Sequence, residues 1–341
     1  MTRQDQVPAE TDTQNGRDWV RILARYREPS QPRSILELVI TLGPFVILMA
    51  LAWWALSVSY VLAAAISALN GAFLIRVFMI QHDCGHSAFF RNRQVNDWLG
   101  RVLGVLTLTP YDVWRRTHSI HHSSAGNLDR RGIGDMPTLT VAEYRSRSWF
   151  GRLLYRVYRH PVFLFGVAPA YLFFLQNRIP VGLMHSGKSW LSAMATNAAL
   201  AALLGVGVWA AGVVPVLLTV LPTTLVAASI GVWLFYVQHQ FEDTRWDWSP
   251  EWEMHDAALH GSSYYVLPPV LRWFTANIGM HHVHHLYSRI PYYRLSEVLR
   301  DHPALARAQR LTLRQSLDCA RRHLWDEKRR KLLSFAEARA A

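Results

Sequence analysis

The sequence predicts an all-α integral membrane protein with four transmembrane helices in two hairpins, interfacial helices, and a cytoplasmic, histidine-rich cap. The first observation behind this fold class is charge segregation. No Asp, Glu, Lys or Arg occurs from Leu38 to Ile75 or from Ser189 to Phe241. A spanning helix needs about 20 apolar residues, so each of these blocks is long enough for two passes joined by a tight turn. The second observation is that three histidine clusters lie close to the blocks.

The two blocks divide into four expected spans, at about residues 38–56, 59–80, 190–211 and 214–237. Trp53 and Trp54 near the end of the first span are typical of interfacial anchors. Between the third and fourth spans we expect Pro215 to break the helix. The segments 98–108 and 162–175 are apolar but too short to cross a membrane, which predicts re-entrant or interfacial helices.

Around the spans we expect three regions. These are an N-terminal cytoplasmic or interfacial arm (1–33), a main domain (34–300) and a basic cytoplasmic C-terminal tail (301–341). The polar first 35 residues do not resemble a cleaved signal peptide, so the first hydrophobic block must itself direct insertion.

The charge balance is strongly basic, with a net charge of +12, but its distribution argues against nucleic-acid binding. Basic residues fill the N-terminal arm, the middle segment and the tail, whereas the expected turns near Ser57 and Gly212 carry none. That asymmetry is what the positive-inside rule predicts for a membrane protein. It places both termini and the clusters in the cytoplasm, most simply at a bacterial inner membrane. Two cysteines, Cys84 and Cys319, suggest no disulfide framework.

The three histidine clusters have spacings that suit a helix face. They are His82-x-x-x-His86, His118-x-x-His121-His122 and His281-His282-x-His284-His285. Residues three and four apart on a helix share one face, so each cluster would aim its imidazoles into one volume. Four spans place every cluster on the same side of the membrane. His282 is off this register and is left out, whereas His239 directly follows the fourth span and is a ninth candidate.

So many imidazoles predict a centre with two metal ions. A structural zinc takes four ligands and a catalytic zinc commonly takes three and a water, so eight or nine ligands exceed one metal. Imidazole suits iron, zinc and copper. A two-iron site able to reduce dioxygen can remove hydrogen from an unactivated C–H bond, and a membrane face suits a substrate acyl chain. Nearby carboxylates, above all Asp83 and Glu242, are expected to orient imidazoles by accepting their distal N–H.

At the clusters the sequence resembles the membrane-bound fatty acid desaturases, and among them the bacterial acyl-lipid members of the Bacillus Δ5 type. The matching stretches are residues 82–90, 117–135, 238–243, 261–265 and 277–286. The resemblance implies a non-haem diiron centre, with O2 as co-substrate, that leaves a cis double bond. The ligands it implies are His82, His86, His118, His121, His122, His281, His284 and His285, with His239 as a further ligand. Asn277 would approach one iron through a water.

The expected partners are a membrane acyl lipid as substrate, the lipid bilayer, and an external electron donor. No cytochrome b5-like motif or Gly-rich dinucleotide fingerprint occurs in the sequence, which favours a ferredoxin or flavodoxin as donor. Exposed arginines would steer such an acidic protein. The candidates are Arg91, Arg93, Arg115, Arg116 and the basic tail, although the same residues are equally explained by membrane topology.

Three other functions remain open from the sequence. A hydroxylase or ketolase on the same scaffold would add oxygen where a desaturase removes a second hydrogen. A zinc-dependent membrane lipid hydrolase would need fewer histidines and no electron donor. A metal or haem carrier would place histidines along its spans, yet the two charge-free blocks contain only His239, at one edge.

Overall fold

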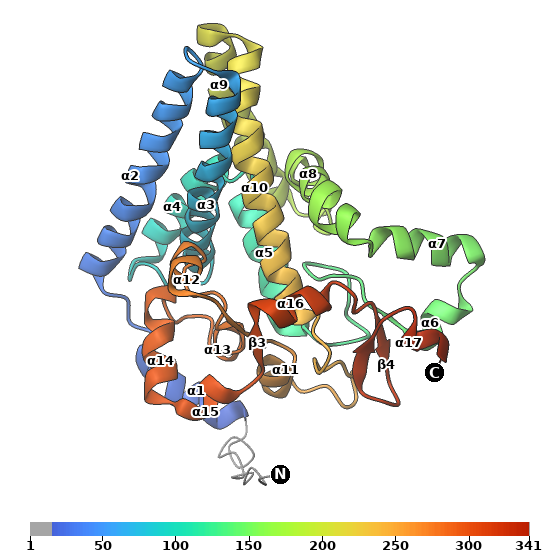
Figure 1. Ribbon diagram of the computed structural model, residues 1–341. Coiled ribbons are helices and arrows are strands. Elements are labelled where there is room, and N and C mark those ends of the chain that lie inside the picture. The colour runs from blue at the N-terminus through green and yellow to red at the C-terminus, as the bar shows by residue number, and fades with distance from the viewer. Residues whose placement is uncertain (1–15, 341) are drawn as a thin grey trace, which may run out of the picture.

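The computed structural model describes residues 16–340, and its four longest helices form an upright bundle above a cap of short elements (Figure 1). The long helices are α2 (Gln31–Ala55), α3 (Tyr60–Gly85), α9 (Gly187–Ala211) and α10 (Val213–His239). Each is long and apolar enough to cross a membrane, and no other helix among residues 16–340 is. The expected all-α fold with four spans in two hairpins is therefore confirmed.

The turn between α9 and α10 is made by a glycine and not by a proline as expected. Gly212 has φ +89°, a backbone conformation that glycine adopts without a steric cost. Pro215 lies in the first turn of α10, where its missing N–H would have no helical partner in any case. In the other hairpin, Ser59 caps α3 by accepting a hydrogen bond from the Leu62 N–H at 3.4 Å.

Helix α3 is the centre of the bundle and packs against both α2 and α10. Small residues allow the close approach, because a Cβ added to Gly71 would lie 2.8 Å from the Cβ of Val226 on α10. Asn70 is buried and donates its amide to the Phe45 carbonyl of α2 at 3.1 Å. Apolar side chains cover the outside, such as Val61, 79% exposed, and Trp209, 88% exposed. A lipid environment accounts for that exposure.

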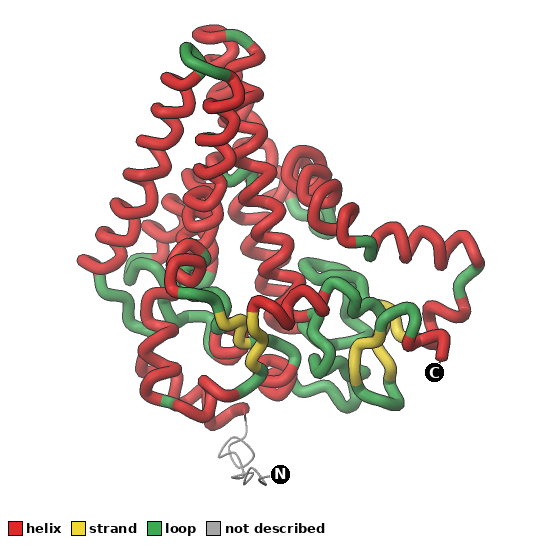
Figure 2. The backbone as a smooth tube through the Cα atoms, viewed as in Figure 1, coloured by secondary structure: helices red, strands yellow, loops and turns green. Residues whose placement is uncertain are grey.

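The segment between the two hairpins is mostly helical, with loops, and lies beside the bundle and the cap (Figure 2). It contains α4 (Arg93–Leu106), α5 (Tyr111–Ser124), α6 (Val141–Ser146), α7 (Trp149–Tyr158) and α8 (Ala168–Ala170), with π-helical turns at 163–167 and 171–175. Helix α7 runs sideways from the bundle (Figure 1). Its outer face carries exposed apolar residues, including Phe150 and Leu154, as an interfacial helix requires.

The cap contains most of the remaining elements. They are α1 (Gly16–Leu23), α11 (Met254–His260), α12 (Pro269–Phe274), α13 (His281–Leu286), α14 (Leu295–Asp301), α15 (Pro303–Arg307), α16 (Leu313–Cys319) and α17 (Glu337–Ala340), with strands β1 (Leu139–Thr140), β2 (Tyr264–Val266), β3 (Arg310–Thr312), β4 (Leu324–Asp326) and β5 (Lys331–Leu333). Strands β1 and β4 are parallel, β4 and β5 antiparallel, and β2 and β3 parallel.

Both terminal regions are folded into this cap, which differs from the expected arm and tail. In the N-terminal region, Trp19 and Leu23 are buried because the apolar side of α1 packs on α11 and α13. Tyr26, which follows α1, is buried and donates to Asp301 at 2.7 Å. Residues 1–15 of the expected arm lie outside the described residues. Beyond residue 300, β3 pairs with β2 and β4 pairs with β1. The fold therefore continues across the boundary that sequence resemblance suggested.

Candidate metal centre

The three histidine clusters meet at the cap end of the bundle, where α3 and α10 finish near α5 and α13 (Figure 1). His82 lies in the last turn of α3 and His86 directly follows that helix. His118, His121 and His122 lie on α5, His239 ends α10, and His281, His284 and His285 lie on α13. Four segments of the chain thus bring their imidazoles into one region.

The nine imidazoles form two adjoining groups. The five-histidine group comprises His82, His86, His118, His122 and His284, and the four-histidine group comprises His121, His239, His281 and His285. In each group, the candidate ligand nitrogens all lie within 4.8 Å of one another. His282, which the helical register excluded, belongs to neither group and directs its Nε2 to the Leu305 carbonyl at 2.9 Å.

Each of the two HxxHH helices contributes to both groups. On α5, His118 and His122 face the five-histidine group while His121 faces the other. On α13 the assignment is reversed, with two residues four apart in the four-histidine group and His284 in the five-histidine group. The rings of His122 and His285 stack at 4.1 Å between centroids, so the two groups are in direct contact.

The spacing of the ring nitrogens fits metal ligands better than hydrogen bonds. The Nε2 of His118 lies 3.1, 3.0 and 3.1 Å from the Nε2 atoms of His82, His86 and His122. One imidazole nitrogen cannot make three hydrogen bonds in its ring plane. Metal–nitrogen bonds of about 2.0–2.1 Å, at angles from octahedral to tetrahedral, would place neighbouring nitrogens roughly 2.9–3.4 Å apart. The donor set therefore fits a cation at the centre of each group.

Burial keeps these imidazoles in the neutral form that binds metals. Burial, and then the neighbouring imidazoles, lower the pKa of the seven candidate ligands outside the spans well below 6.5; they are His86, His118, His121, His122, His281, His284 and His285. His121, His281 and His284 are buried and the other four are partly buried, so a charged imidazole would lose much of its hydration there. The centre is thus ready to accept a cation at neutral pH.

The lowered pKa values predict that metal-free protein is labile in acid. Below pH 6.5 the unfolded chain protonates these histidines, whereas the folded chain does not until the pH reaches their lowered pKa. The free energy of unfolding therefore falls with decreasing pH, by up to about 1.4 kcal/mol per histidine and pH unit. Thermal unfolding of the metal-free protein above and below pH 6.5 measures this. An unfolding temperature that does not change across pH 6.5 would contradict it.

Aromatic side chains outside the clusters support the rings. The Trp114 indole stacks on His118 with centroids 4.6 Å apart and an interplanar angle of 18°. Phe235 lies against His121 and His239 at 5.0 and 5.3 Å. Sequence reasoning did not assign either residue, although Trp114 precedes His118 by one helical turn. Together they restrict the rotation of ligand rings in both groups.

Gly85 makes room for Trp114, so we expect Gly85→Ala to disturb the five-histidine group. An added Cβ would lie 2.6 Å from the Cζ3 of Trp114 and displace the indole from His118. We expect a loss of about 1–3 kcal/mol in unfolding free energy and roughly tenfold weaker metal retention. Thermal unfolding and metal analysis measure both effects. The matched control is Gly43→Ala, where a Cβ meets nothing within 4 Å; equal effects of the two substitutions would contradict this role.

The three residues expected beside the metal ligands have different surroundings. Asp83 is closest to expectation, with its Oδ1 3.4 Å from the Nδ1 of His82. Glu242 instead pairs with Arg322 and with Lys331, at 3.0 Å from the Lys331 Nζ. The Nδ1 of His239, three residues before Glu242, lies 3.2 Å from the Gly261 carbonyl instead of a carboxylate. Asn277 donates to the Tyr292 carbonyl at 3.0 Å.

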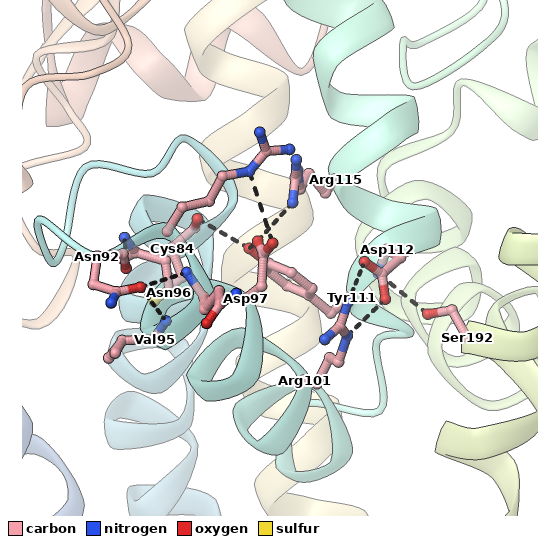
Figure 3. A network of polar contacts seen from close by, with 12 residues as sticks. Cys84, Asn92, Val95, Asn96, Asp97, Arg101, Tyr111, Asp112, Arg115 and Ser192 are labelled. Atoms are coloured by element: carbon pink, nitrogen blue, oxygen red, sulfur yellow. Dashed lines mark hydrogen bonds and ion pairs between the residues drawn. The ribbon is translucent and has the colours of Figure 1, made fainter.

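A polar network around Asp97 joins α3, α4 and α5 (Figure 3). Asp97 accepts from Arg115 at 2.6 Å and forms a longer ion pair with Arg93 at 3.9 Å. The Tyr111 hydroxyl lies 2.9 Å from the Cys84 carbonyl and 3.1 Å from Asp97. Arg93 and Arg115 therefore have ion-pair partners within the protein. Arg91 and Arg116 are exposed and form no ion pair among residues 16–340.

The sequence also matches known proteins. Residues 53–316 match a family model described as fatty acid desaturase. A fatty acid desaturase of Bacillus subtilis is 41% identical over 313 residues, which cover 92% of this chain and 89% of the relative. An sn-1 acyl-lipid omega-3 desaturase (ferredoxin) of Synechocystis is 28% identical, covering 67% of this chain and 63% of that protein. An sn-1 oleoyl-lipid 12-desaturase of Synechocystis is 25% identical, covering 79% and 75%.

Proposed function

This chain belongs to the fatty acid desaturase family, and we propose that it introduces a cis double bond into an acyl chain of a membrane lipid at a diiron centre. The observation that carries the site assignment is the pair of adjoining histidine groups at the end of four apolar helices. The five-histidine group would hold one iron ion and the four-histidine group the other.

Iron suits both the donor set and the reaction. Imidazole binds iron, zinc and copper, but zinc has no redox chemistry. When bound, the two irons supply the O2-dependent oxidising power that no side chain has. Two neighbouring methylenes each lose one hydrogen; with O2, two electrons and two protons taken up, the products are one carbon–carbon double bond and two waters.

The residues of the chain hold and shield this centre. Neutral imidazoles provide nitrogen donors without competing protons, and Trp114 and Phe235 fix the rings of His118 and His121. The four apolar helices, which end near the histidine groups, support a centre at the face of a bilayer. An acyl chain dissolved in that bilayer can reach the centre without leaving an apolar environment.

The electron donor that we propose is a ferredoxin or flavodoxin. One relative carries ferredoxin in its name, and the sequence has no dinucleotide fingerprint. Arg91 and Arg116, both exposed, provide positive charge for an acidic donor. Salt would weaken such steering.

For the location we propose a bacterial inner membrane, with the histidine groups and both termini in the cytoplasm. The turn residues 56–59 and 212 carry no Lys or Arg, whereas the opposite end of the bundle carries Arg33, Arg91 and Arg116. The positive-inside rule then puts the cap in the cytoplasm.

The relatives favour desaturation over the other functions that the sequence left open. The relatives named above are all desaturases, which argues against a hydroxylase or ketolase. A zinc hydrolase would leave most of nine convergent imidazoles without a role. A carrier would distribute its histidines through the spans, yet those of this chain meet at one end.

The function is tested by expressing the protein, with a reduced ferredoxin system, in a bacterial host that has no desaturase. We expect new cis-unsaturated acyl chains in the membrane lipids, seen by gas chromatography and mass spectrometry, and none when O2 is withheld. Hydroxylated chains in their place would identify a hydroxylase. Unchanged lipids, with active donor and folded protein present, would reject the proposed function.

A further inference from the structure

Two charged residues are buried inside the spanning helices, Glu37 on α2 and Arg76 on α3. They are 1% and 2% exposed, respectively, and form an ion pair with each other. Arg76 also donates to Thr41 at 3.0 Å and to the Trp273 carbonyl. Its guanidinium lies 4.0 Å from the Trp273 ring centroid. Burying two charges costs desolvation even when they are paired, so the pair calls for an explanation beyond packing.

Tyr292 connects this ion pair to the neighbourhood of the histidines. Its hydroxyl donates to Glu37 at 3.0 Å, and its backbone N–H donates to the Asp83 carboxylate at 2.7 Å. Its carbonyl accepts from Asn277 at 3.0 Å. Tyr292 is itself buried. One residue thus contacts the ion pair, the carboxylate next to His82, and the loop that leads to α13.

We propose that Glu37, Arg76, Tyr292 and Asp83 form a network that positions His82 in the five-histidine group. The Asp83 carboxylate lies beside the Nδ1 of His82. Asp83 is held in turn by the Tyr292 N–H, and the place of Tyr292 is fixed by Glu37. None of the four belongs to either histidine group. They are positioning residues, and their role depends on the proposed function because it presumes an iron ion in that group.

Stability alone does not explain the ion pair. Replacing a buried ion pair by apolar residues of similar volume is often neutral or stabilising. Forming the pair requires the desolvation of two charges. In return, the Glu37 carboxylate is a fixed acceptor for the Tyr292 hydroxyl. Loss of groups that orient a ligand imidazole typically weakens metal binding by about 10–100-fold. Fold stability and iron retention should therefore respond differently when the network is altered.

The test follows iron release to a chelator from purified protein, with release from the two groups assigned by spectroscopy. Tyr292→Phe removes only the hydroxyl and leaves both backbone hydrogen bonds in place. We expect iron to leave the five-histidine group about tenfold faster, while release from the four-histidine group is unchanged. The matched control is Tyr293→Phe, which removes a neighbouring hydroxyl that bonds Ser30 and Ser34 instead.

A double variant, Glu37→Leu with Arg76→Met, separates positioning from stability. We expect an unfolding temperature equal to or above that of the wild type, together with the same faster release from the five-histidine group. If Tyr292→Phe releases iron at the wild-type rate, the proposed network is wrong. It is also wrong if iron release becomes faster by the same factor from both groups. Wild-type protein that holds two irons but makes no double bond would overturn the proposed function alone. Wild-type protein with no iron would overturn both.

Discussion

His121→Ala is expected to abolish desaturation while leaving the protein folded. His121 is fully buried, and its Nε2 lies 3.1 Å from that of His239 in the four-histidine group. Alanine leaves that group three imidazoles and an opening for water, so one iron is lost or weakly held. Because the two irons act as a unit, the rate should fall by about a thousandfold or more. Lipid profiling of the expressing host and metal analysis of the purified variant measure both losses.

The matched control for this substitution is His282→Gln. His282 lies in the third histidine cluster and is fully buried, but its Nε2 contacts the Leu305 carbonyl and no other histidine. Glutamine keeps a donor for that carbonyl, so activity should stay near that of the wild type. A His121→Ala variant that keeps full iron and more than about a tenth of the activity would contradict the assignment of this ligand.

Zinc in place of iron is expected to give a folded but inactive protein. Both metals accept imidazole nitrogens, so the nine histidines should bind zinc with little change in the fold. Zinc cannot change oxidation state, and product formation should fall below about a thousandth of that of the iron form. The measurement compares metal-free protein reloaded with zinc or iron, supplied with O2 and reduced donor.

Reloading with iron supplies the control, because it should restore the double bond. A zinc form that makes the double bond as fast as the iron form would contradict the requirement for a redox-active metal. Unfolding temperatures of the two forms show whether the metals occupy the same sites. A large difference in unfolding temperature would mean that zinc does not bind at the sites that iron occupies.

The nine histidines that meet in the structure could be named from the sequence, but their division into two groups could not. Spacings of three and four residues bring His118, His121 and His122 to one side of a helix. Which of the three faces which group depends on the rotation of α5 relative to α13, and no local pattern encodes that rotation. Two residues four apart go to one group on α5 and to the other group on α13.

The number of spans could likewise be predicted from the sequence, but the residues at which they end could be predicted less well. Charge-free blocks locate them, yet α3 continues through Arg76 and Asp83 to Gly85 because tertiary partners satisfy both charges. Those partners, Glu37 and Tyr292, are 39 and 209 residues away from them in the chain. The folding of α1 and of the C-terminal strands into the cap depends on similar long-range contacts. Their polar and basic composition gave no sign of these contacts.

The most direct test of two irons held by nine histidines is metal analysis, combined with Mössbauer spectroscopy, of protein purified from iron-replete cells. We expect two iron ions per chain in the wild type. His121→Ala should lose the iron of the four-histidine group and keep most of the other. A single metal per chain, a predominance of zinc, or an iron spectrum that His121→Ala leaves unchanged would contradict the diiron assignment.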